Sequence, residues 1–123
     1  MKKLMFVVLA LCMLAPLAYS APKTINSAPK TIKGTIIDNM CAESHKADMA
    51  TFIKTHPKSC AIAPNCMASG YSIYFSGQLM KFNDASNKKI ADFLKISDSK
   101  LTVDVEVNKV KGLLDLVSIK NSK

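Results

Sequence analysis

Residues 101–107 read Leu101-Thr102-Val103-Asp104-Val105-Glu106-Val107, with an apolar side chain at every second position and a polar one between. This alternation predicts a β-strand that turns one face to a core and the other to solvent. Because neighbouring side chains of a strand point to opposite faces, the leucine and the three valines should pack inward together. The stretch therefore indicates a mainly β domain.

Four more strands are expected around this one. Their residues are β-branched, aromatic or apolar, and turn-forming residues separate them, above all the tight turn at Ser76-Gly77, which is typical of a β-hairpin. A second turn is expected at 108–112, directly after the alternating strand. The four expected strands are 31–38, 71–75, 78–82 and 113–119.

A helix is expected between the third and the fourth strand. Asp84 or Ser86 can cap its N-terminus, and Ile90, Phe93 and Leu94 recur at the spacing of one buried helix face. The chain then has the order three strands, one helix and two strands.

That order is the one found in the OB fold, a five-stranded and partly open barrel. We therefore expect residues 31–123 to form a mainly β, OB-fold-like domain with helices. A helical insertion at 41–70 would lie between its first and second strands.

Residues 1–20 have the pattern of a secretory signal peptide. Two lysines precede an apolar stretch that is short for a membrane span, and small residues at the end predict cleavage after Ser20. A flexible tether is expected at 21–30. The sequence thus predicts a periplasmic or secreted protein with no membrane span after cleavage.

All of the formal positive charge in this chain is carried by lysine side chains. The formal net charge is +8, and it falls to +6 when Lys2 and Lys3 leave with the signal peptide. The chain has no arginine, the residue that reads phosphates and bases with a bidentate fork. We therefore expect no nucleic-acid partner, and an oligosaccharide, an anionic surface or a partner protein stays open.

Cysteine and histidine residues gather in the expected insertion. Export takes their thiols out of the reducing cytosol, so a disulfide or a metal ion is the expected fate. On a continuous helix over 42–55, the two histidines would lie about 16 Å apart along the axis, so at most one could join the thiols at a metal. The five residues are Cys41, His45, His56, Cys60 and Cys66.

A disulfide between Cys41 and Cys66 is the first expectation. The first two strands of an OB barrel pair antiparallel, which would bring Asp38 close to Tyr71 and place both cysteines just beyond these strand ends. The bridge would close the neck of the insertion and add about 3 kcal/mol of stability in the chain-entropy model. Cys60 would remain an odd thiol, open to intermolecular pairing or reaction.

A metal site is the alternative, and it excludes the disulfide. Cys41 and His45 are spaced i, i+4 on the expected helix, and Cys60 and Cys66 could complete a tetrahedral Cys3His set suited to zinc or copper. The disulfide and the metal site imply two alternative functions. The domain is a binding or structural module stapled by the disulfide, with no cofactor, or a periplasmic metal-binding or thiol-redox protein.

Enzymatic activity is not expected. The sequence has no HExxH motif, no glycine-rich phosphate loop and no Ser/His/Asp order, so no catalytic residue is predicted. As a binding module, the barrel would offer Tyr74, flanked by Ser72 and Ser76, as a surface that stacks on a sugar or base ring.

Two spaced motifs carry a resemblance to known proteins. They are Gly34-x3-Asp38-x2-Cys41 and, further along, His56-x3-Cys60-Ala61-x4-Cys66-x3-Gly70. Over about residues 34–119 the chain resembles a loose group of small, uncharacterised exported bacterial proteins. The resemblance implies an OB-fold-like domain with a Cys/His insertion, and it implies no particular activity.

Overall fold

The computed structural model describes residues 28–123, so the expected signal peptide and most of the expected tether lie outside the described residues. These residues form five strands and five helices, and the strands and the last helix follow the order that the sequence predicts. They are β1 (Lys30–Asp38), α1 (Asn39–Ser44), α2 (Met49–Phe52), α3 (Lys58–Ala61), α4 (Pro64–Ala68), β2 (Tyr71–Phe75), β3 (Gln78–Lys81), α5 (Asp84–Leu94), β4 (Thr102–Val110) and β5 (Leu113–Asn121).

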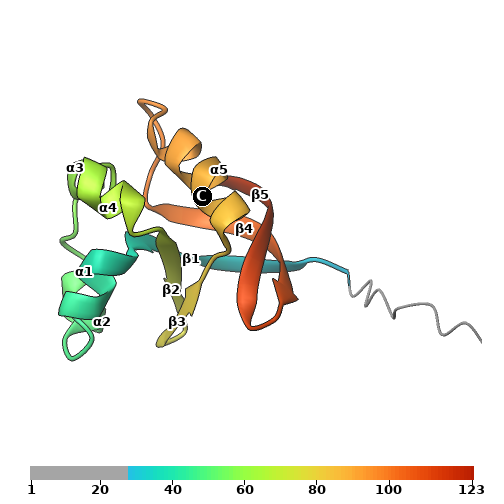
Figure 1. The fold of residues 1–123 in the computed structure, drawn as a ribbon, viewed down its shortest axis with the longest axis horizontal. Helices are drawn as coiled ribbons and strands as arrows, with labels where there is room; N and C mark the ends of the chain where they lie inside the picture. The colour runs from blue at the N-terminus through green and yellow to red at the C-terminus, as the bar shows by residue number, and fades with distance from the viewer. Residues whose placement is uncertain (1–27) are drawn as a thin grey trace, which may run out of the picture.

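The strands form one antiparallel sheet in the order β3-β2-β1-β4-β5 (Figure 1). β1 lies at the centre, and its register with β2 places Asp38 opposite Tyr71, as expected. The outer strands approach each other at a single parallel bridge, Phe82 with Leu114. The sheet therefore curls but does not close.

The alternating stretch supplies the core. Val103, Val105 and Val107 are each at most 3% exposed, whereas Leu101 precedes β4 and is only half-buried. From α5, Ile90 and Leu94 pack fully buried against this face. The inward face of β4 and the buried face of α5 are thus confirmed.

Two boundaries differ from the sequence-based prediction. The cap of α5 is Asn83, not Asp84 or Ser86, and its side chain accepts a hydrogen bond from the Ser86 N–H. The β4–β5 turn is also tighter than 108–112. Lys111 and Gly112 both have positive φ, the geometry of a two-residue turn that matches the twist of paired strands.

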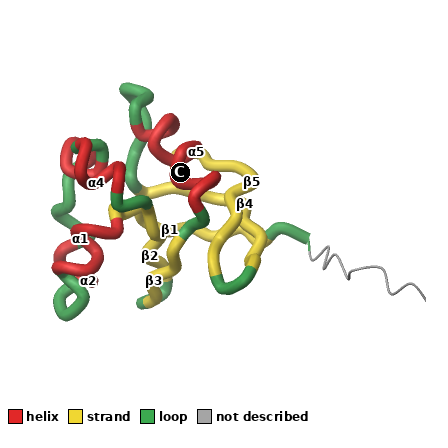
Figure 2. The backbone as a smooth tube through the Cα atoms, viewed as in Figure 1, coloured by secondary structure: helices red, strands yellow, loops and turns green. Residues whose placement is uncertain are grey.

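We call residues 39–70 the helical segment. Its helices gather at one end of the sheet, away from the β4–β5 turn (Figure 2). The expected continuous helix over 42–55 is wrong, because α1 ends at Ser44, turns follow, and α2 contains only four residues. α3 and α4 were not predicted, since four or five residues are too few to show a helical period, although prolines mark both starts.

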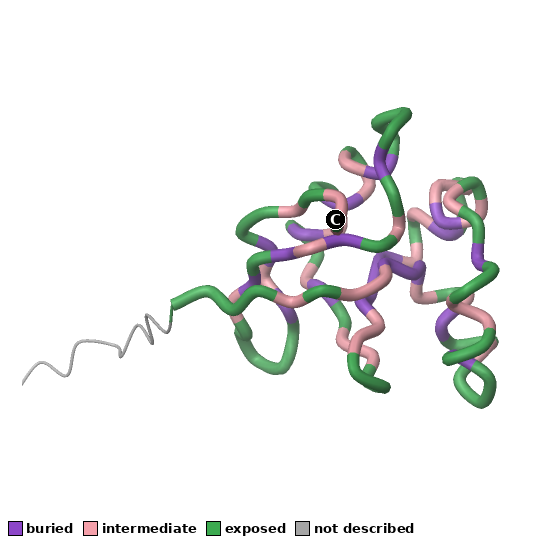
Figure 3. The backbone as a smooth tube through the Cα atoms, turned by 180° about the vertical axis from the view of Figure 1, so that it is seen from behind, coloured by how far each residue is buried: buried purple, intermediate pink, exposed green. Residues whose placement is uncertain are grey.

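The helical segment has a core of its own. Ile37 of β1, Ala42 and Met49 are buried together. Figure 3 shows buried stretches in the helical segment as well as in the sheet. Tyr74 of β2 packs against this cluster and is half-buried. It is therefore not the free stacking surface that the sequence suggested.

Candidate metal centre

Asp38 and Cys41 are placed by the junction of β1 and α1. Asp38 ends β1 and is fully buried, and its Oδ2 accepts a hydrogen bond from the backbone N–H of Cys41 at 2.9 Å. The carboxylate therefore caps α1 and fixes the first turn that carries Cys41.

His56 reaches the same point from the end of the turn after α2. Its side chain is fully buried, and its Nε2 lies 3.2 Å from Oδ1 of Asp38. Even so, neither this oxygen nor either ring nitrogen of His56 has a hydrogen-bond partner among the described residues. Buried polar atoms without partners are rare and cost about 1–3 kcal/mol each.

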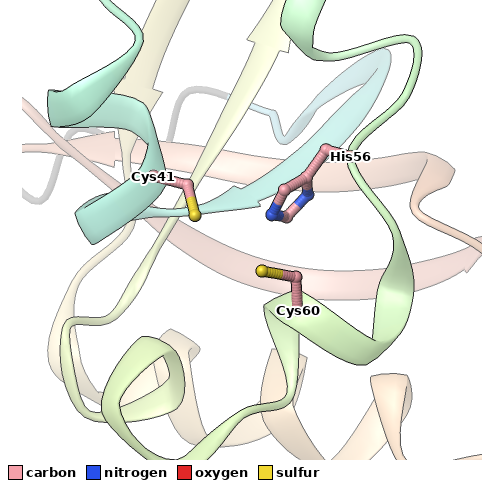
Figure 4. Close-up of side chains that lie close together, drawn as sticks. All are labelled: Cys41, His56 and Cys60. Carbon is pink, nitrogen blue, oxygen red and sulfur yellow. The ribbon is translucent and has the colours of Figure 1, made fainter.

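The thiols complete the cluster. The ligand atoms of Cys41, His56 and Cys60 all lie within 4.8 Å of one another, and so do those of Asp38, Cys41 and Cys66. Figure 4 shows the first three side chains converging from separate parts of the backbone, with the imidazole facing the two sulfur atoms. Cys41 belongs to both groups and is the shared member of the cluster.

The environment keeps the Cys41 and Cys66 thiols and the His56 imidazole uncharged when no cation is bound. Burial, together with the Asp38 carboxylate, raises the pKa of the Cys41 thiol to about 12, and the same causes raise the pKa of Cys66. Burial also lowers the pKa of His56, against the opposing pull of Asp38. At neutral pH the imidazole is therefore neutral, with one nitrogen free to donate a lone pair to a metal.

The structure brings together only part of the metal set predicted from the sequence. Cys41, Cys60 and Cys66 meet, but His45 belongs to neither ligand group found in residues 28–123. Its Nδ1 lies 3.1 Å from Asp48, and its ring stacks on Phe52 with the centroids 3.6 Å apart.

His56 and Asp38 were missed as site residues. The assumption of one long helix made the two histidines alternatives and favoured His45, which lies outside both ligand groups of the described residues. The available signal was the pair of spaced motifs, in which Asp38 precedes Cys41 and His56 precedes Cys60.

The expected disulfide is not formed in this structure. Cys41, Cys60 and Cys66 are all free thiols. The expected proximity is nevertheless present, because the sulfur atoms of Cys41 and Cys66 lie within 4.8 Å of each other.

Hydrogen bonds hold the helical segment against the sheet. The buried Tyr71 hydroxyl donates to the Ala61 carbonyl at 2.8 Å, directly after Cys60. Asn39 donates to the Ser69 carbonyl and accepts from the Ser72 hydroxyl, at 2.8 and 2.6 Å. These bonds fix α1, α3 and the end of α4 relative to β2, and with them the cysteines.

Lys58 fastens α3 to the loop after α5. Its ammonium group donates at 2.9–3.2 Å to the carbonyls of Ile96, Ser97 and Ser99 and to the Ser99 hydroxyl. It thereby satisfies carbonyls that follow the helix C-terminus, where a cation is favoured.

We expect Lys58→Met to lower the free energy of unfolding by about 1–3 kcal/mol, because it leaves these acceptors without their charged donor. Urea unfolding measures the effect, and Lys54→Met, at an exposed position, should stay within about 0.5 kcal/mol of wild type. Equal midpoints for the two variants would show that the Lys58 contacts do not stabilise the domain.

Among residues 28–123, no helix combines the length and the apolar content needed to cross a bilayer. No protein-family model, curated protein or solved structure matches the chain at a significant level.

Proposed function

We propose that this protein is an exported metal-binding domain that holds zinc through Cys41, His56 and Cys60, with Cys66 as the fourth ligand. The observation that carries the proposal is a buried imidazole that forms no hydrogen bond to any described residue at either nitrogen, with only the Asp38 carboxylate 3.2 Å from Nε2. Its ligand atom lies within 4.8 Å of two thiols. A metal ion would supply the missing partner.

The donor set suits zinc in type and spacing. Zinc takes cysteine and histidine ligands in a tetrahedron at about 2.0–2.3 Å, which puts neighbouring ligand atoms about 3.3–3.8 Å apart. The atoms of the first group already lie within 4.8 Å of one another. These three side chains would therefore reach a shared zinc ion by shifts on the order of 1 Å, whereas Cys66, the proposed fourth ligand, shares only Cys41 with this group.

Charge favours zinc over monovalent copper. Metal ligation removes the protons of the thiols, so the site becomes more negative around the buried Asp38 carboxylate. Burying net charge is costly. A dication balances two thiolates, whereas Cu(I) balances one and leaves a larger excess of negative charge.

The alternative functions have less support. A binding module that stacks on Tyr74 conflicts with the packing of that side chain beneath the helical segment. A thiol-redox enzyme needs a reactive thiolate, and the pKa of Cys41, raised to about 12, disfavours one there.

The architecture and location are part of the same proposal. The strand order, the position of α5 and the Phe82–Leu114 bridge support a partly open barrel of the OB type, with the helical segment as an insertion. The pattern of residues 1–20 supports export, as does the resemblance to small exported proteins.

The two histidines provide a matched test. In reduced, purified protein, we expect His56→Ala to weaken zinc binding by more than about 100-fold, since even residues that only orient a ligand contribute 10–100-fold. His45→Ala should leave the affinity within about threefold, because His45 belongs to neither ligand group.

Competition with a chromogenic chelator measures zinc affinity, and cobalt absorption reports thiolate and imidazole ligation. Circular dichroism checks that both variants stay folded. Absence of zinc and cobalt binding in the wild type would refute the proposed function. Loss of binding in His45→Ala alone would restore the ligand set predicted from the sequence.

A further inference from the structure

Cys41 has two possible fates in this cluster. It is a proposed metal ligand, and its sulfur also lies within 4.8 Å of the sulfurs of Cys60 and Cys66. A cysteine in a disulfide cannot ligate a metal as a thiolate, so one bond through Cys41 would remove it from the metal site.

The three thiols differ in access. Cys41 and Cys60 are both partly exposed, whereas Cys66 on α4 is only 7% exposed. An external oxidant therefore reaches the first two before the third. Because Lys58 and Ala61 hold α3 in place, the Cys60 sulfur would approach Cys41 by rotation of its own side chain.

We propose that Cys41 and Cys60 form a reversible disulfide by exchange with an external disulfide, and that this oxidation expels the metal ion. The inference rests on the proposed function, because it states how that metal site is regulated. Oxidation removes two of the ligands at once, so His56 and Cys66 remain, too few to retain zinc in competition with a chelator.

The reaction balances with a small-molecule disulfide as the oxidant. The Cys60 sulfur attacks the external disulfide and releases one small thiolate. The Cys41 sulfur, which metal ligation would leave deprotonated despite the burial of this thiol, then attacks the mixed disulfide on Cys60, forms the internal S–S bond and releases the second small thiolate. Two protein thiolates are oxidised, one external disulfide is reduced to two thiols that take up two protons, and zinc leaves as Zn²⁺.

The geometry favours Cys60 over Cys66 as the partner of Cys41. Both sulfurs lie within 4.8 Å of Cys41 and must approach to about 2.05 Å for a bond. The mixed disulfide that starts the exchange needs room for an external group, which a partly exposed Cys60 offers and a buried Cys66 does not.

The test treats the zinc-loaded protein with oxidised glutathione and follows released zinc with a chromogenic chelator. Disulfides are mapped by mass spectrometry of non-reduced peptides. We expect zinc release in proportion to a Cys41–Cys60 bond, and recovery of zinc binding after addition of a reductant. Cys60→Ser should form no bond at Cys41, whereas Cys66→Ser should form the same bond as the wild type.

Three results would overturn the inference: a Cys41–Cys66 bridge, retention of zinc after complete oxidation, or a glutathione adduct that never resolves. If the reduced protein binds no zinc, the proposed function fails separately. The disulfide map of the oxidised, metal-free protein then tests the oxidation step alone, and any disulfide other than Cys41–Cys60 refutes that step.

Discussion

Val105→Asp is expected to remove a large part of the stability of the domain. Val105 lies in β4, is 1% exposed, and is paired with Ile32 on β1 and Ile119 on β5. The substitution removes a buried apolar side chain and places a carboxylate where the two flanking partners are isoleucines, at a cost of about 4 kcal/mol or more. A domain of this size has a total stability of about 5–14 kcal/mol.

Thermal and urea unfolding followed by circular dichroism measure this effect. Thr102→Asp is the matched control, because it adds the same charge to the same strand at an exposed position. The control should change the free energy of unfolding by less than about 0.5 kcal/mol. A Val105→Asp protein that melts within a degree or two of wild type would show that this face of β4 is not the core.

The strands could be predicted because each one has a local sequence signal, either alternating apolar and polar residues or a run of β-branched and aromatic residues. The alternation of 101–107 requires one buried face, and the order of the elements then leaves few topologies. Asp38 opposite Tyr71 follows from that order alone. The exact position of the turn at Lys111-Gly112 was harder to predict. The pairing of β4 with β5 extends up to the turn, and only these two residues have the positive φ that defines it.

The helices of the helical segment could not be predicted from a sequence period. Its helices have four to six residues, shorter than the window over which a helical period is visible. Their positions depend on contacts distant in the chain, such as the Tyr71 hydroxyl on the Ala61 carbonyl. The sequence identified the cysteines as the chemistry of the domain, but the choice of His56 required the fold.

Alkaline pH is expected to destabilise the metal-free, reduced protein strongly. Burial raises the pKa of the Tyr71 hydroxyl from 10.0 to about 12, and burial with the Asp38 charge raises that of Cys41 from 9.0 to about 12. The unfolded chain releases these protons at lower pH than the native state. Between pH 9 and 12 the unfolded state therefore binds fewer protons, and the free energy of unfolding falls as pH rises.

The contribution of these groups is fully present below about pH 9 and is lost progressively as the pH approaches 12. Tyr71 alone accounts for about 3 kcal/mol, since each unit of pKa corresponds to 1.36 kcal/mol. Urea unfolding of the chelator-treated protein between pH 8 and 11 measures the slope of the free energy of unfolding against pH.

Tyr71→Phe separates the titration from the packing, because it keeps the ring, loses the hydrogen bond at every pH and cannot ionise. Its stability should fall less steeply than that of the wild type, and parallel slopes would show that the Tyr71 hydroxyl is not protected from ionisation in the native state.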